Sequence, residues 1–183
     1  MRLRALIILS AVALMLGACD FFKYPRNGIY LIPKGFTGAV IILFERPDGV
    51  ELLVEDGLYV YRIPNDGLLK VKGKGYTGMV NLSYYYVDDE GRREQLKYLR
   101  ITGENDINGQ PKDKFDGQIN KAEYESGIFV TNTGGIGTTI GRKGNFSYTS
   151  FIVGAPKDID RHYSEKENRL FALQREAIEK GLH

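Results

Sequence analysis

Turn signals recur through the first half of the chain, and their spacing constrains the fold more than any other feature. Between residues 28 and 101, short segments rich in Val, Ile, Leu, Tyr and Phe are separated at roughly ten-residue intervals by Gly, Asp, Asn and Pro. Repeated turns at this spacing favour hairpins packed in two layers. We therefore predict a mainly β domain, an antiparallel β-sandwich, over residues 28–163. The turns are Pro47-Asp48-Gly49, Asp56-Gly57, Asn65-Asp66-Gly67 and Asp89-Glu90-Gly91.

The segments between these turns are the predicted strands. Residues 39–44 are apolar at every position, which is typical of a central strand covered on both faces. Residues 102–118 are interpreted as a polar loop and residues 134–144 as a glycine-rich connection. Residues 74–80 have nearly the same sequence as residues 34–40. The similarity reflects either a duplication or a residue pattern that is common where a chain enters a strand. The predicted strands are 29–32, 39–45, 50–54, 58–63, 68–71, 79–87, 93–101, 127–132 and 148–153.

A helix is predicted at the C-terminal end, over residues 164–182. Ser164 and Glu167 have the spacing of a capping box, and Gly181 stands where the helix would end. An amphipathic helix of this kind normally packs on its own sheet. Its predicted apolar stripe comprises Leu170, Phe171, Leu173, Ala177 and Ile178.

The N-terminal residues have the pattern of a bacterial lipoprotein signal. Arg2 and Arg4 precede about twelve apolar residues, too few to cross a hydrocarbon core of roughly 30 Å. Leu16-Gly17-Ala18-Cys19 then forms a lipobox that ends in the single cysteine. We expect residues 1–18 to be a helical signal peptide that is removed, and Cys19 to carry a diacylglyceryl group with chains such as palmitate. The alternative is an ordinary cysteine after a generic secretory signal.

Residues 19–27 are predicted to be a short membrane tether. Eight residues separate Cys19 from Gly28, and a fully extended segment of that length reaches about 28 Å. Two or three acyl chains hold a protein to a bilayer almost irreversibly, so we expect an exported domain that lies against a membrane without spanning it. In a cell with two membranes, Asp20 favours the outer face of the cytoplasmic membrane, and the outer membrane is the alternative. Phe21 and Phe22 are expected either to enter the interface or to pack on the domain.

Composition argues against several classes of partner. The chain has 25 Lys+Arg and 23 Asp+Glu, and removing Arg2 and Arg4 with an acid-free signal leaves 23 of each. A nearly neutral protein lacks the basic face that nucleic acid requires, so no nucleic-acid partner is expected. With Cys19 acylated, no thiol remains for a disulfide or for a thiolate metal site.

Two segments and one histidine resemble parts of known functional sites, but each lacks residues that such a site requires. Residues 104–109 resemble half of a calcium loop, but Phe115 occupies the position of the bidentate acid. Residues 134–144 contain Gly, Thr and Lys in an order unlike that of a phosphate loop. His162 would have to serve alone as a catalytic base, beside acids that are interpreted as a solvated turn. We therefore predict no metal site, no cofactor and no catalytic residue.

Three motifs stand out in the β region: Ile29-Tyr30-Leu31-Ile32-Pro33-Lys34-Gly35-Phe36-Thr37-Gly38, Gly57-Leu58-Tyr59-Val60-Tyr61-Arg62-Ile63-Pro64 and Phe151-Ile152-Val153-Gly154. Together they resemble a family of bacterial exported proteins known as a domain of unknown function, from about residue 28 to residue 154. The resemblance implies a mainly β domain on the cell envelope and brings no catalytic residue with it. Residues 49–64 also resemble transthyretin-like and carboxypeptidase-regulatory-like sandwiches, in architecture alone.

These observations favour a non-catalytic binding module, anchored to a membrane, whose partner is another envelope protein. The alternatives are an immunity or inhibitor lipoprotein directed against a toxin or hydrolase, and a hydrolase that uses carboxylates alone. In residues 79–87, the period of two places Tyr84 in the core and Tyr85 on the outer face. Exposed tyrosines often anchor interfaces, so Tyr85 is the predicted binding residue. The alternative is that Tyr85 only covers its cross-strand neighbours.

Overall fold

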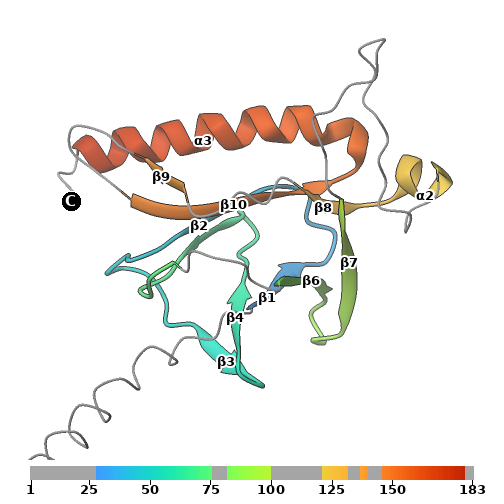
Figure 1. Cartoon of the computed structure of the whole chain (residues 1–183), viewed down its shortest axis with the longest axis horizontal. Helices are drawn as coiled ribbons and strands as arrows, with labels where there is room; N and C mark the ends of the chain where they lie inside the picture. Colours follow the sequence, from blue (N-terminus) through green and yellow to red (C-terminus); the bar gives the residue numbers. More distant parts are fainter. Residues whose placement is uncertain (1–27, 76–81, 100–120, 132–136, 140–145, 180–183) are drawn as a thin grey trace, which may run out of the picture.

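The computed structural model describes residues 28–75, 82–99, 121–131, 137–139 and 146–179 (Figure 1). The predicted signal peptide, the tether with Cys19 and the calcium-like loop at 104–109 lie outside these described residues. Within the described ranges, no helix is long and apolar enough to cross a membrane.

The described strands are β1 (Gly28–Pro33), β2 (Gly38–Leu43), β3 (Leu53–Glu55), β4 (Leu58–Arg62), β5 (Leu68–Lys70), β6 (Leu82–Val87), β7 (Arg93–Leu99), β8 (Phe129–Thr131), β9 (Gly137–Thr139) and β10 (Phe146–Gly154). The helical segments are α2 (Lys121–Ser126), the short 3-10 helix η2 (Pro156–Asp158) and α3 (Ile159–Glu179).

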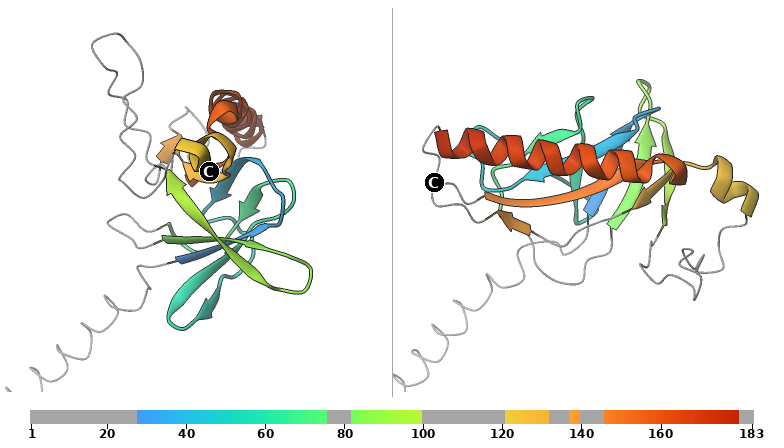
Figure 2. Two further views of the ribbon diagram at one scale, coloured as in Figure 1. Left: turned by 90° about the vertical axis from the view of Figure 1, so that its right-hand side faces the viewer. Right: turned by 90° about the horizontal axis from the view of Figure 1, so that it is seen from above.

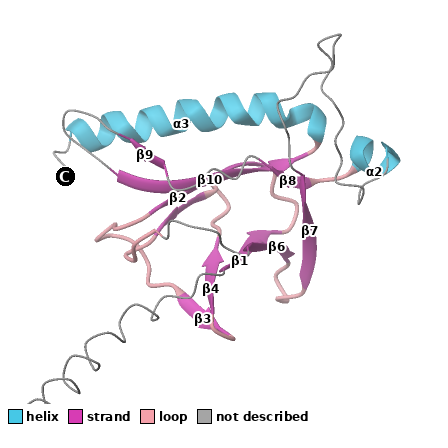
Figure 3. Ribbon diagram, in the orientation of Figure 1, coloured by secondary structure: helices cyan, strands magenta, loops and turns pink. Residues whose placement is uncertain are grey.

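The strands form one curled, mixed sheet, and α3 lies along its outer side (Figures 1 and 3). The order across the sheet is β3-β4-β1-β6-β7-β8-β10-β2-β5, and β9 pairs with β10. The helix packs against β2 and β10, two strands that are mostly buried. The prediction of a mainly β domain with a C-terminal helix is therefore confirmed.

The pairing of the strands differs from that of an antiparallel sandwich. Strand β1 runs parallel to β4 and β6, β2 runs parallel to β5, and β7 runs parallel to β8. Of the four turn signals, two close hairpins, at Asp56-Gly57 and at Asp89-Glu90-Gly91. The turn at Asn65-Asp66-Gly67 instead brings β5 beside β2. A turn residue reverses the chain locally, but burial of both sheet faces decides which strands become neighbours.

A cluster of aromatic rings fills the inside of the curl. Tyr30 stacks on Tyr61 and Tyr84, with ring centroids 4.6 and 5.1 Å apart, and Phe151 meets Tyr30 and Tyr84 edge-on at 5.2 Å. Burial raises the pKa of Tyr30 well above its ordinary value, so the phenol stays neutral. Figure 2 shows the curl from one end, with α3 on one side and the β3–β4 hairpin on the other. The aliphatic members of this core include Ile32, Val40, Ile42, Ile63, Leu69, Val71, Leu96, Val130 and Val153.

The C-terminal helix begins at Ile159, earlier than the predicted start at Ser164. The predicted capping box is therefore wrong: Ser164 lies within α3, and its hydroxyl donates to the carbonyl oxygen of Asp160 at 3.0 Å. Pro156 opens the 3-10 turn that leads into the helix, since proline fits the first turn of a helix. The packed face of α3 also differs from the predicted stripe, because Phe171 and Ile178 are exposed. The buried residues of α3 are Ile159, His162, Lys166, Leu170 and Ala177.

Candidate binding groove

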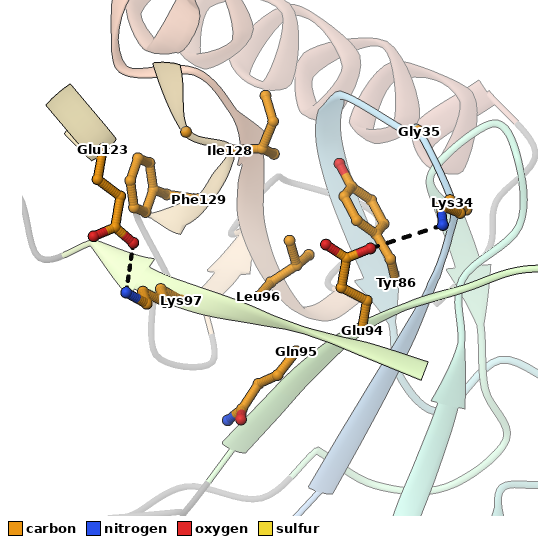
Figure 4. A pocket seen from close by; sticks show the side chains of 11 residues that line it. Lys34, Gly35, Tyr86, Glu94, Gln95, Leu96, Lys97, Glu123, Ile128 and Phe129 are labelled. Atoms are coloured by element: carbon orange, nitrogen blue, oxygen red, sulfur yellow. Dashed lines mark hydrogen bonds and ion pairs between the residues drawn. The ribbon is translucent and has the colours of Figure 1, made fainter. Parts of the chain in front are cut away.

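An open groove of about 420 Å³ lies beside the first half of β7 (Figure 4). Five parts of the chain line it: β7, the start of the β1–β2 turn at Lys34 and Gly35, Tyr86 of β6, Glu123 of α2, and the segment from Gly127 to Phe129 that enters β8. A volume of this size falls within the range of small-ligand and side-chain pockets.

The floor of the groove is apolar. Leu96, Ile128 and the ring of Tyr86 line it. Phe129 is paired with Lys97 and therefore lies on the opposite face of the sheet from Leu96, and Figure 4 shows it beside Glu123. The hydroxyl of Tyr86 donates to the carbonyl oxygen of Phe36 at 2.6 Å. Burial, and after it the Glu94 carboxylate, raises the pKa of Tyr86 to about 12, so this phenol remains a hydrogen-bond donor at neutral pH.

The rim of the groove carries both signs of charge. Lys34 Nζ lies 3.8 Å from Glu94 Oε2, and both side chains are largely exposed. At the other end, Lys97 on β7 donates to the carboxylate of Glu123 on α2. Exposed pairs of this kind add little stability. They leave the mouth of the groove polar and close to neutral around an apolar centre.

One backbone hydrogen bond establishes which peptide groups of β7 face the groove edge. In an antiparallel pair, opposed residues alternate between those that exchange hydrogen bonds and those that do not. The Lys34 N–H donates to the Val87 carbonyl at 2.9 Å, so Val87 bonds toward β1 and not toward β7. Val87 is opposite Arg93, and Tyr85, two residues earlier, is opposite Gln95. The peptide groups of Arg93 and Gln95 therefore point away from β6.

These outward groups have no strand beside them in the described part of the chain. Strand β8 pairs with β7 only from Lys97↔Phe129 to Leu99↔Thr131. The edge of β7 at Arg93–Gln95 is exposed. A strand added there would lie in line with β8, which pairs with the later residues of β7. An N–H and a C=O from each residue are thus available to an extended chain placed there.

The predicted binding residue Tyr85 lies on the outer face of the sheet, as expected, and is half-buried. It packs with Ile29, Leu31 and Val60 in a small apolar cluster on that face. Tyr84 is buried in the main core, so the predicted orientation of the strand is confirmed. Because Tyr85 is opposite Gln95, it lies one strand, about 4.8 Å, from the open edge. The role of Tyr85 in binding stays a prediction.

His162 is buried on α3, whereas Asp158 ends the 3-10 turn η2 and Asp160 is exposed in the first turn of α3. Its Nδ1 lies 2.9 Å from Glu165 Oε2, and this hydrogen bond is the main reason why the pKa of Glu165 is lowered. The ring packs on β10, where a Cβ added at Gly154 would lie 3.0 Å from Cδ2. This arrangement anchors the helix to the sheet. No group of three metal-ligating side chains occurs among the described residues.

The fold and the groove define a mainly β domain with a curled sheet and an open strand edge. The chain belongs to the family of unknown function DUF6843, whose model matches residues 25–154. The crystal structure of a predicted lipoprotein from Bacillus anthracis is similar, with 21% identity, 73% of each chain covered and a TM-score of 0.47. No curated protein matches the chain.

The groove has a weak signal in the sequence. Leu96 is the single apolar residue in Arg93-Glu94-Gln95-Leu96-Lys97, a run otherwise typical of a charged, solvent-facing strand. Such charges are common on open strand edges, where they limit unwanted pairing. The pattern indicates an exposed strand, but the partners that wall the groove come from residues 34–35 and 127–129, which only the fold brings together.

Proposed function

We propose that this chain is a lipid-anchored envelope protein that binds another envelope protein by pairing with an extended segment of it at the open edge of β7. The observation that carries the proposal is the outward-facing peptide groups of Arg93 and Gln95 beside an apolar groove. Added strands gain affinity from backbone hydrogen bonds and specificity from pockets that take alternate side chains. The groove supplies such a pocket on the face of Glu94 and Leu96.

The chemistry of the groove defines the segment that it binds. A side chain that points to the face of Leu96 meets Leu96, Ile128 and the ring of Tyr86, which favours an aliphatic or aromatic residue. Its neighbours along the segment meet Lys34 and Glu94 at one end and Lys97 and Glu123 at the other. We therefore expect an apolar residue flanked by polar or charged residues, with no proline at the positions that pair with β7.

The lipid anchor in this proposal rests on the lipobox that ends at Cys19. Wild-type protein is expected to incorporate labelled palmitate and to sediment with membranes. Cys19→Ala is expected to lose the label and to appear in the soluble exported fraction. Equal recovery of both proteins in membranes would contradict the anchor.

Site-specific photocrosslinking tests the binding function in living cells. A photoreactive amino acid replaces Gln95, at the open edge, or Arg175, an exposed residue of α3 that serves as the control. The full chain with the probe at 95 is expected to crosslink a discrete envelope protein, and the chain with the probe at 175 is not. Equal products from the two positions, or none from position 95, would contradict the proposal. The identity of the product distinguishes a structural partner from a toxin or hydrolase held by an inhibitor.

A further inference from the structure

Exposed apolar side chains gather on β3 and just before it. Among the described residues, Val50, Leu53 and Val54 are 53%, 63% and 58% exposed, and we call these three residues the β3 patch. Val50 forms an isolated parallel bridge with Val71, and β3 is the outermost strand at its end of the sheet. In Figures 1 and 2 the β3–β4 hairpin projects on the side of the molecule opposite α3.

Strand register places this patch beside the point where the described chain begins. Val54 is paired with Tyr59, and Tyr59 is paired with Gly28, the first residue of β1. Two strand spacings of about 4.8 Å therefore separate Val54 from Gly28. Eight residues separate Gly28 from Cys19, a reach of at most about 28 Å. A lipid anchor on Cys19 would hold this end of the domain near the bilayer surface.

We infer that the β3 patch docks on the lipid bilayer and sets how the anchored domain is oriented. The inference rests on the lipid anchor of the proposed function, and it concerns a different surface from the groove. Leu53 and Val54 are consecutive in β3 and point to opposite faces of the hairpin, so the β3 patch is an apolar strand edge and not one face. An anchored protein repeatedly presents its nearest side to the bilayer, and apolar side chains at that edge enter the boundary between headgroups and acyl chains.

Two of the carboxylates beside the patch are paired, and Asp56, at the turn of the hairpin, is exposed. Arg93 donates two hydrogen bonds to Glu55, of 2.7 and 2.8 Å. Lys72 Nζ lies 3.7 Å from Glu51 Oε1. A paired carboxylate loses less on approaching an apolar medium than a lone one. Because the contact is apolar, its strength is expected to change little with salt.

Tryptophan fluorescence tests the inference, because the chain contains no tryptophan. Leu53→Trp places a single fluorophore in the β3 patch. Phe171→Trp is the matched control on α3, since Phe171 is 62% exposed and Leu53 is 63% exposed. The acylated full-length variants are reconstituted in vesicles of equal parts phosphatidylethanolamine and phosphatidylglycerol, with or without brominated acyl chains. Flotation confirms that each variant is bound.

The expected result is a blue-shifted emission from Leu53→Trp that brominated lipid quenches, with no change for Phe171→Trp. Flotation of both variants without quenching of Leu53→Trp overturns the inference and leaves the anchor intact. A blue shift without quenching places the patch against protein, and it also overturns the inference. Failure of either acylated variant to float contradicts the anchor itself, and the inference falls with it.

Discussion

The hydroxyl of Tyr86 donates a 2.6 Å hydrogen bond to the carbonyl oxygen of Phe36 and thereby ties β6 to the turn between β1 and β2. The bond is partly buried and crosses 50 positions of sequence. It fixes one wall of the groove, because Lys34 and Gly35 stand immediately before Phe36.

Tyr86→Phe removes this bond and leaves the ring in place. We expect the free energy of unfolding to fall by about 1 kcal/mol, the usual contribution of a hydrogen bond in a partly buried position. Tyr85→Phe is the control, since its hydroxyl makes no hydrogen bond with the described residues. Chemical denaturation measures both changes, and equal losses for the two variants would contradict this role of Tyr86.

The two central tyrosines of β6 should respond differently to truncation. Tyr84→Ala empties a buried position between Tyr30 and Phe151 and is expected to cost about 3 kcal/mol of unfolding free energy. Tyr85→Ala is expected to cost much less, because its ring is half-buried on the outer face. The predicted interface role of Tyr85 further requires that this variant captures less partner. A larger loss of stability for Tyr85→Ala would contradict the assignment of the two faces.

Acid should loosen the hairpin that carries the β3 patch. Hydrogen bonds from Arg93 hold the pKa of Glu55 below its ordinary value. A depressed folded-state pKa means that the ionised pair stabilises the fold above the unfolded pKa of about 4.3. This contribution is lost as the pH falls through the folded pKa. We expect unfolding free energy to decline below about pH 4.3 and to decline less steeply in Glu55→Gln. Identical pH profiles for wild type and Glu55→Gln would contradict a role for the pair.

Local features of the fold could be predicted from the sequence because they depend on neighbouring residues. Period-two alternation correctly placed Tyr84 in the core and Tyr85 on the outer face, and hydrophobic spacing correctly indicated a C-terminal helix. The start of that helix was missed because the packed face includes His162 and Lys166, polar residues that a search for an apolar stripe passes over. The buried ring of His162 is hydrogen-bonded to Glu165, and the Nζ atom of Lys166 lies 4.1 Å from the ring centroid of Tyr163.

Strand pairing and the groove could not be predicted from the same patterns. Parallel pairs such as β1 with β6 join segments far apart in the chain, and nothing in the local sequence specifies the partner. The open edge of β7 arises because β8 covers only Lys97, Tyr98 and Leu99. That overlap is a property of the assembled sheet. The charged residues Arg93 and Glu94 indicate an exposed strand, but they do not show whether its edge is protected or can pair with an added strand.

The central claim is that the backbone at Gln95 binds an extended peptide, and two variants isolate that backbone from its side chain. Gln95→Ala keeps the outward N–H, whereas Gln95→Pro removes it without removing a hydrogen bond to β6. The probe is a peptide selected from a random display library against the full-length protein. Melting curves first establish that both variants are folded, and sedimentation that they do not self-associate.

Calorimetric titration of that peptide into wild type, Gln95→Ala and Gln95→Pro tests the account most directly. We expect Gln95→Ala to bind like wild type and Gln95→Pro to bind roughly tenfold more weakly, a difference of ~1.4 kcal/mol, with all three proteins equally folded. Unchanged affinity in a folded Gln95→Pro variant would contradict strand addition at β7.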